Sequence, residues 1–540
     1  MIELSTVRRL TLASALVLGA ANVVAASLQP SYDGVRRKYI WFGWDTQNLS
    51  AEQVLDNAAA FDASVYDGIP VNVVVKDPQT GKSLSVHAIF DNPEITDEML
   101  APHVPVLKEI VAHRGLRESF ISSFYTPKKR VAWTDDEMWA KAARTMAALA
   151  RAAKAAGVRG LFMDQEEYHP PKQFEWQVGD PTFADCARLA RQRGREVFAQ
   201  AFRDYPEMAV FSCYGMLSAD ATFDYFGSPD PFDATRQKRD LWPHFFNGML
   251  DAAPFSARLI DGTEMAYEYE QGREEYAKSA ACVKVRGRSV VAPENRAKYG
   301  AVAQASFGFF MDGYVKTNKT ARYWYDALNG SRLGHFDHNL WGATHWSDEY
   351  VWLYAASQRM TGIHWRNKNG NFNGWTTPND RLPGYDQVAL ANKDPLAWFT
   401  LRVGELKAQG KLVNLCTKPM DEILAPNKDR PDMRFGIIEF PEAKAGDWYG
   451  FRFRARGEVQ SIVRWGETGL RARPLGASIL PVCTPMGEPD AEGWRAAVGV
   501  VRIPNDVQRP VLVLKTFAEN GQTSSISEFA LYRLLSHQER

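Results

Sequence analysis

Two acidic residues follow an apolar run in the middle of the sequence. Residues 157–163 are mostly apolar and lead directly into Asp164, with Glu166 two positions later. Alternate residues of an extended chain point to the same side, so these two carboxylates face one way and Gln165 faces the other. Because two close carboxylates do not ionise together easily, one of them has a raised pKa and can donate a proton near neutral pH.

A glycosidic bond is one bond that such a pair can cleave. The leaving oxygen needs a proton donor, and the developing oxocarbenium charge needs a second carboxylate or a substrate group. We assign the proton donor to Glu166 and a modulating role to Asp164. The alternative is that Asp164 caps the next segment and that Glu166 and Glu167 are solvated loop charges. Their position at the end of an apolar strand favours catalysis.

The second carboxylate has several candidates near predicted strand ends. Glu264 ranks first, because Gly262 permits a sharp turn that aims Glu264 toward the same site. Asp312 is explained equally well as part of a turn after its strand. Asp348 and Glu349 are explained equally well as an end cap or a solvated corner.

Aromatic and polar residues near strand ends complete the candidate site. Sugar rings present C–H faces that stack on aromatic planes, and the sequence contains 16 Trp. Many of these aromatic residues belong to the core, but their number favours a carbohydrate ligand. The predicted substrate contacts are Trp44, Asp45, Tyr125, Tyr168, Tyr214, Asp312, Asp348, Glu349 and Trp352.

The elements that must position these residues alternate between strands and helices. Amphipathic segments, the clearest at 135–156 and 182–205, separate short β-branched or aromatic runs. This pattern predicts a (β/α)₈ barrel of the TIM type, although an open, doubly wound parallel sheet has the same pattern. The eight predicted strands are 39–44, 69–75, 119–125, 158–163, 208–213, 258–260, 308–311 and 350–354.

The helical period disappears after residue 410. Short alternating runs replace it, which predicts an all-β sandwich as an accessory domain. We therefore expect a barrel domain over residues 33–410, closed by a helix at 395–409, and a sandwich over residues 411–540.

The motif at the fourth predicted strand resembles a known signature. Residues 160–166, with Tyr168 and Pro170 after them, are similar to the fourth-strand motif of chitinase-type glycoside hydrolases. In that family an Asp two residues before the catalytic Glu supports substrate-assisted cleavage of N-acetylhexosamines. The resemblance implies the same roles for Asp164 and Glu166. Arg159 and Phe162 stand where the family carries further Asp residues, and Glu167 is an insertion.

The two ends of the predicted barrel carry a broader resemblance. An opening Gly-Trp-Asp segment at 43–45 and an aromatic eighth strand at 348–352 are similar to exported bacterial barrel hydrolases with a C-terminal β-sandwich. This resemblance concerns the architecture and implies no particular sugar.

Residues 1–26 have the pattern of a signal peptide. Arg8 and Arg9 precede an apolar run at 10–24, and small residues follow at a cleavage-like site. The run is shorter than the roughly 20 residues that span a membrane. We therefore expect an exported protein, periplasmic or extracellular, without stable membrane insertion. Lys+Arg and Asp+Glu both number 64, which gives no electrostatic reason for nucleic acid binding.

The favoured function is hydrolysis of a poly- or oligosaccharide by carboxylate acid/base catalysis. A carbohydrate-binding protein without catalysis and a polysaccharide lyase are the alternatives, and a lyase predicts an Arg or Lys near Glu166. We identify no cofactor or metal motif: His335 and His338 have no third ligand nearby, and the 5 Cys are scattered. The sequence specifies neither the oligomeric state nor the sugar.

Overall fold

The computed structural model describes most of the chain after residue 36, and the predicted signal peptide lies outside the described residues. The chain forms two compact units, the first from residues 37–323 and 342–381 and the second from residues 324–341 and 382–540. No helix among the described residues is long and apolar enough to cross a membrane. The described ranges are 37–167, 170–215, 231–269, 273–320, 322–356, 377–464, 480–481, 483–505, 510–519 and 522–536.

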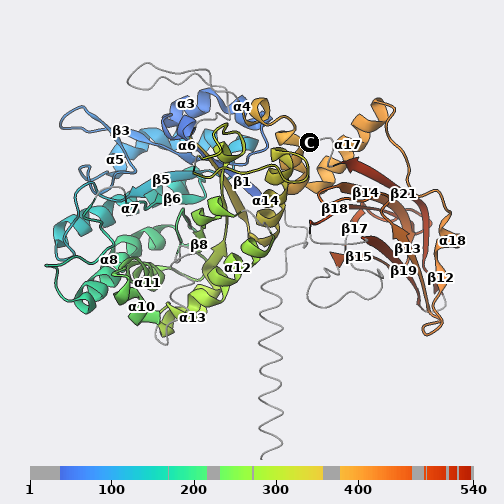
Figure 1. The fold of residues 1–540 in the computed structure, drawn as a ribbon. Coiled ribbons are helices and arrows are strands. Elements are labelled where there is room, and N and C mark those ends of the chain that lie inside the picture. Colours follow the sequence, from blue (N-terminus) through green and yellow to red (C-terminus); the bar gives the residue numbers. More distant parts are fainter. Residues whose placement is uncertain are drawn as a thin grey trace, which may run out of the picture. The chain divides into compact units, whose positions relative to one another are not determined.

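The first unit contains parallel strands with helices between them (Figure 1). One sheet has the order β1-β11-β10 and another has the order β2-β5-β6-β7-β8-β9. The strands are β1 (Lys38–Gly43), β2 (Pro70–Val71), β5 (Phe120–Tyr125), β6 (Gly160–Asp164), β7 (Ala209–Ser212), β8 (Arg258–Asp261), β9 (Ala303–Ala305), β10 (Gly308–Phe310) and β11 (Tyr350–Ala355). Each of the eight predicted strands overlaps one of these.

Backbone hydrogen bonds link the two parallel sheets. Ile40 of β1 and Gly68, just before β2, form a parallel bridge, and the Trp41 amide donates to the Gly68 carbonyl at 3.0 Å. Strands β9 and β10 are separated by only two residues, and the second of these, Phe307, accepts from the Trp352 amide at 3.1 Å. An antiparallel hairpin, β3 (Val74–Lys76) and β4 (Ser83–Ser85), lies between β2 and β5 in the sequence.

The two long helices of the first unit end where their sequences predict. The Asp135 side chain accepts from the Met138 amide at the start of α7 (Asp136–Ala156), and Gly157 ends that helix with a left-handed φ of 77°. The Thr182 side chain caps α8 (Phe183–Asp204). The other helices are α2 (Trp44–Gln47), α3 (Ala51–Asp56), α4 (Ala58–Ala63), α5 (Asp97–Leu100), α6 (Val104–Ile110), α10 (Pro231–Gln237), α11 (Trp242–Ala252), α12 (Arg273–Lys284), α13 (Arg296–Val302) and α15 (Pro378–Arg381).

An aromatic cluster lies among the parallel strands. Phe162 of β6 packs on Phe211 of β7, with ring centroids 5.1 Å apart, and on Trp352 of β11. Trp352 is 1% exposed, and its indole N–H donates to the Gly262 carbonyl at 2.7 Å. Trp352 is therefore a core residue, and its predicted role as a substrate contact is wrong. Alternation along the strand turns its side chain into the cluster.

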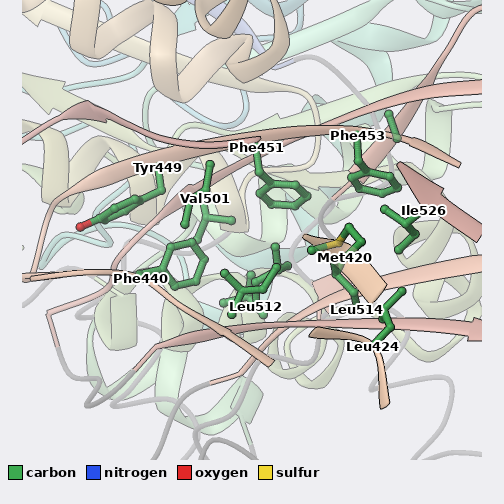
Figure 2. Close-up of a cluster of buried hydrophobic side chains, with 14 of the residues drawn as sticks. Met420, Leu424, Phe440, Tyr449, Phe451, Phe453, Val501, Leu512, Leu514 and Ile526 are labelled. Atoms are coloured by element: carbon green, nitrogen blue, oxygen red, sulfur yellow. The ribbon is translucent and has the colours of Figure 1, made fainter. Parts of the chain in front are cut away.

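The second unit contains two antiparallel sheets, with the orders β12-β13-β19-β15-β16 and β17-β18-β14-β21. The strands are β12 (Ala425–Pro426), β13 (Met433–Glu439), β14 (Trp448–Arg456), β15 (Val459–Arg464), β16 (Leu480–Pro481), β17 (Cys483–Met486), β18 (Arg495–Arg502), β19 (Val511–Glu519), β20 (Gln522–Thr523) and β21 (Ser525–Leu535). Figure 2 shows their shared core, in which Tyr449, Phe451 and Phe453 of β14 alternate inward.

Helices before residue 411 also belong to the second unit. It includes α16 (Tyr385–Lys393), α17 (Pro395–Ala408), α18 (Met420–Ile423) and the first part of α14 (Arg332–Trp346). In α17 the Trp398 ring lies 5.4 Å from the Trp448 ring, and the Arg402 Nε donates to the Leu534 carbonyl at 2.8 Å. Helix α17, predicted to close the first domain, packs instead on strands that follow residue 411.

A buried ion pair lies inside this second unit. The Asp337 carboxylate accepts from the Arg502 Nε at 2.6 Å, and both side chains are 0% exposed. The Trp448 indole N–H and the Asn392 amide also donate to Asp337, at 3.2 and 2.9 Å. One carboxylate thus ties α14, α16, β14 and β18 together.

We predict that Asp337→Asn destabilises the protein by about 3 kcal/mol or more, because it leaves the buried Arg502 charge without its counterion. The matched control is Asp432→Asn, which breaks an exposed pair with Arg430 at 2.7 Å. That control should have little effect, since exposed pairs contribute little. Denaturant unfolding of both variants measures the difference, and equal losses of stability would contradict the prediction.

Candidate active site

Four neighbouring strands end at the same edge of the larger parallel sheet. Strands β5, β6, β7 and β8 are adjacent in that order, and Tyr125 pairs with Asp164 as the last residues of β5 and β6. Tyr214 follows β7 by two residues, and Glu264 follows β8 by three. Because the strands are parallel, their carboxyl ends present these side chains together. The structure thus brings Asp164, Glu166 and Glu264, which the sequence predicted as site residues, to one edge of this sheet.

A network of backbone hydrogen bonds fixes the loop that carries Glu264. The Gly262 amide donates to the Ser212 carbonyl at 2.7 Å, and the Glu264 amide donates to the Cys213 carbonyl at 3.2 Å. A Cβ on Gly262 would lie 2.6 Å from that Ser212 oxygen, so this close approach requires glycine. The left-handed residue of the turn is Thr263, with φ 41°. The turn predicted from Gly262 is present.

Asp261 fastens the loops after β7 and β8 to each other. Its Oδ1 accepts from the Thr263 amide at 3.0 Å and from the Gly215 amide at 3.2 Å. Gly215 has no room for a side chain, because a Cβ there would overlap the Asp261 carboxylate. Asp261 therefore has a positioning role in the loops that carry Tyr214 and Glu264.

The Tyr214 hydroxyl contacts one of the glutamates and lies near the other. It donates to the Glu166 Oε1 at 3.1 Å. A hydrogen bond donated to a carboxylate favours its charged form, so this contact stabilises ionised Glu166. Burial, and then the Glu264 and Glu166 charges, raise the pKa of Tyr214, which places Glu264 close to the same hydroxyl.

The electrostatics of the three acids favour different protonation states for them. Burial, and then the Glu166 charge, raise the pKa of Asp164 to about 7. Burial raises the pKa of Glu264 well above its usual range, and repulsion from Glu166 and Asp164 adds to this. Burial also raises the pKa of Glu166, but the Tyr214 hydroxyl and the nearby Arg322 charge oppose that shift. Glu166 is thus the favoured site for negative charge, whereas the sequence motif suggested that it holds the proton.

Residues that sequence reasoning did not select also lie at this site. Arg322 is near enough to lower the pKa of both Glu166 and Glu264. Its guanidinium lies 4.5 Å from the centroid of the Tyr323 ring, which in turn packs edge-on against Tyr267. No periodicity in the sequence marks this segment, because it belongs to neither a helix nor a strand.

The predicted contact Tyr125 lies beside the acids. Burial, and then the Asp164 charge, raise its pKa above the ordinary value for tyrosine. Its ring stacks on His87, with centroids 4.0 Å apart and planes inclined by 22°. Burial lowers the pKa of His87 to about 4, so this imidazole is neutral at physiological pH. The side chains of Trp44 and Tyr168 lie outside the described residues.

Two other predicted contacts have structural roles. Asp45 is buried and accepts from the Trp41 indole N–H and the Thr46 amide, each at 2.9 Å. Asp312 is also buried and accepts from the Ala356 amide at 2.7 Å. Both carboxylates thus accept from N–H donors of the protein itself, as buried polar groups must be hydrogen-bonded. The structure does not support them as substrate contacts.

Asp348 and Glu349 lie at the amino-terminal end of the parallel strands. Asp348 pairs with Lys284 at 2.9 Å, and Glu349 pairs with Lys38, the first residue of β1, at 2.5 Å. Both acids precede β11, so they are at the opposite edge from Asp164 and cannot join it in one site. Their predicted role as substrate contacts is wrong, and the lysines explain their presence.

The described residues contain no group of three or more His, Cys, Asp or Glu side chains that could hold a metal ion.

Neither a protein-family model nor a curated protein matches this sequence. Among solved structures, a glucosidase from Croceicoccus marinus is 8% identical, with a TM-score of 0.38, and the match covers 90% of this chain and 97% of the glucosidase chain. A GH18 chitinase from Pseudoalteromonas aurantia is 12% identical (TM-score 0.32; 62% and 96% covered). A 3-keto-D-glucoside 4-epimerase from E. coli is 11% identical (TM-score 0.32; 68% and 100% covered). Likenesses at this level assign neither a family nor an activity to this chain.

The raised pKa of Asp164 predicts how stability depends on pH. Its folded-state pKa of about 7 exceeds the ordinary 3.8, so the folded protein binds the extra proton and the wild type loses stability as pH rises through this interval. Asp164→Asn cannot ionise and escapes that loss. The variant should therefore gain stability relative to wild type from about pH 4 to pH 7, and the gain should then level off.

Denaturant unfolding across this pH range measures the effect. Asp180→Asn is a control of opposite sign, because the Arg130 side chain at 2.7 Å lowers the pKa of Asp180. That variant should lose stability near neutral pH, and its deficit should shrink as the pH falls. A constant difference between Asp164→Asn and wild type would contradict the assignment.

Proposed function

We propose that this protein is a glycoside hydrolase whose reaction is carried out by Glu166 and Glu264, with Asp164 beside them. The observation that carries the proposal is the position of both glutamates just past the carboxyl ends of β6 and β8 in one parallel sheet, with the Tyr214 hydroxyl donating to Glu166 at 3.1 Å. One half-buried site thereby holds an ionised carboxylate, Glu166, and a protonated carboxyl group, Glu264. Glycosidic cleavage requires this combination of a charge-stabilising carboxylate and a proton donor.

The charges favour particular roles. Glu264, whose proton is retained by burial and by two like charges, donates to the leaving oxygen. Glu166 is ionised and meets the positive charge that develops at the anomeric carbon. Asp164, with a pKa of about 7, is the group that sets how much negative charge the cluster carries near neutral pH. This assignment exchanges the roles predicted from the motif for the two glutamates.

The proposal also covers the fold around the site and the export of the protein. The strands form a closed (β/α)₈ barrel, which is supported by the bridge between Ile40 and Gly68 and by the short step from β9 to β10. The site then lies at the carboxyl end of the barrel, where enzymes of this fold carry their chemistry. The pattern of residues 1–26 supports export. The substrate is a poly- or oligosaccharide in the periplasm or outside the cell.

We predict that Glu166→Gln reduces glycan cleavage by about 10²-fold or more, the scale of a lost acid–base or nucleophilic group. Product release from a panel of bacterial and plant glycans measures this and identifies the substrate class. The matched control is Glu167→Gln, because that carboxylate accepts from the Phe174 amide at 3.0 Å and an amide oxygen can do the same.

Equal cleavage by wild type and Glu166→Gln would remove Glu166 from the mechanism. Binding of a glycan that wild type never cleaves would instead support a carbohydrate-binding protein that has the aromatic residues without the chemistry.

The roles of the two glutamates can be separated through the leaving group. A leaving group of low pKa departs without protonation, so loss of the proton donor affects it little. We therefore predict that Glu264→Gln loses cleavage of the natural linkage but keeps much of its activity on aryl glycosides with acidic phenols. Glu166→Gln should lose both activities. The reverse pattern would restore the roles implied by the sequence motif.

A polysaccharide lyase is the second candidate, because Arg322 supplies the cation near Glu166 that such an enzyme needs. Lyase cleavage leaves an unsaturated sugar at the new end, whereas hydrolysis adds water. The ultraviolet absorbance of the product therefore distinguishes the two reactions in the same glycan panel.

A further inference from the structure

Two cations lie over neighbouring aromatic rings, and one of them, Arg322, is near the acidic cluster. The Arg322 guanidinium is 4.5 Å from the centroid of the Tyr323 ring, and the Lys316 Nζ is 4.5 Å from the centroid of Phe310. The two rings pack on each other at 5.2 Å. Lys316 also donates to the Arg322 carbonyl at 2.7 Å, which holds the two ends of this segment together.

The Arg322 guanidinium is accessible to a further partner. It is exposed, and its contact with the exposed Glu268 is long, at 3.5 Å. Such a surface pair contributes little and is easily exchanged for a better partner. A guanidinium has five N–H donors in a planar fork, which matches the two oxygens of a carboxylate or sulfate.

The backbone at this position is held in an uncommon conformation. Tyr323 has φ 57°, in the left-handed region that bulky residues rarely adopt. Its ring is nevertheless fixed between Phe310 and Tyr267, both of which belong to or pack on the aromatic cluster below the acids. The platform under Arg322 is thus built into the core of the first unit.

An anionic substrate group is compatible with the neighbouring acids. Three ionised carboxylates would repel such a group, but burial raises the pKa of Asp164 to about 7 and that of Glu264 above its usual range, so the cluster carries fewer than three negative charges near neutral pH. The remaining charge on Glu166 is opposed by Arg322 itself.

We infer that Arg322, stacked on Tyr323, binds an anionic group of the glycan, the carboxylate of a uronate or a sulfate ester. This inference rests on the proposed function, because it names the substrate class of the same site. Arg322 is in this role a specificity-determining residue, and Lys316 positions it.

The test is a binding measurement with the full-length Glu166→Gln protein, in which the ligand stays intact. Two matched ligand pairs are compared by calorimetry: oligogalacturonate with its methyl ester, and a sulfated galactan oligosaccharide with its desulfated form. We predict that the charged member of one pair binds about tenfold or more tightly than its neutral partner, the scale of one charge-assisted hydrogen-bonded pair. The first pair reports a uronate and the second a sulfate.

Adding Arg322→Gln should abolish that preference and leave the affinity for the neutral partner unchanged. Adding Lys319→Gln is the matched control, since it removes an exposed positive charge from the same segment and should leave the preference intact. The absence of selective binding to the charged member of either pair would overturn the inference. An equal loss of affinity for charged and neutral ligands in Arg322→Gln would also overturn the inference.

Failure of this inference differs from failure of the proposed function. Glu166-dependent cleavage of neutral and charged glycans at equal rates would refute the role of Arg322 and leave the hydrolase in place. Selective, Arg322-dependent binding without any cleavage would refute the hydrolase and leave the anion site in place.

Discussion

The crowding of three carboxyl groups at one edge of a parallel sheet is the constraint on which this structure depends. Asp164, Glu166 and Glu264 are buried enough that burial raises the pKa of each. Charged groups are costly in such surroundings, and the cost is lowered when protons are retained and hydrogen bonds are made. The Tyr214 hydroxyl provides such a hydrogen bond to Glu166 and favours the charged form of that glutamate.

The aromatic core supplies the burial and also holds the loops. Trp352 packs on Phe162 below the acids and donates from its indole N–H to the Gly262 carbonyl. The turn that carries Glu264 is therefore attached to the core as well as to the neighbouring loop through Asp261. A site fixed in this way has little freedom to relieve repulsion by moving its acids apart. Raised pKa values are the remaining way to lower the energy.

The sequence predicted the elements well because their signals are local. Alternation, helix periodicity and caps such as Asp135 and Gly157 depend on residues close in the chain. Proximity to a strand end proved a weaker guide to function. Asp348 precedes its strand and so lies at the opposite edge, and Asp45 and Asp312 follow theirs but accept hydrogen bonds from other N–H groups of the protein. Whether a carboxylate is already satisfied depends on contacts that spacing does not encode.

The roles of the individual acids within the cluster could be predicted from the sequence even less well. A pair such as Asp164 and Glu166 predicts that some proton is held near neutral pH, because their closeness follows from the extended chain. Which group holds it depends on partners from other strands. Tyr214 comes from the end of β7, and Arg322 comes from a segment without regular structure, yet both favour the charged form of Glu166. The chemistry of the motif is thus decided by the fold around it, and the same short sequence can place the proton donor on either glutamate.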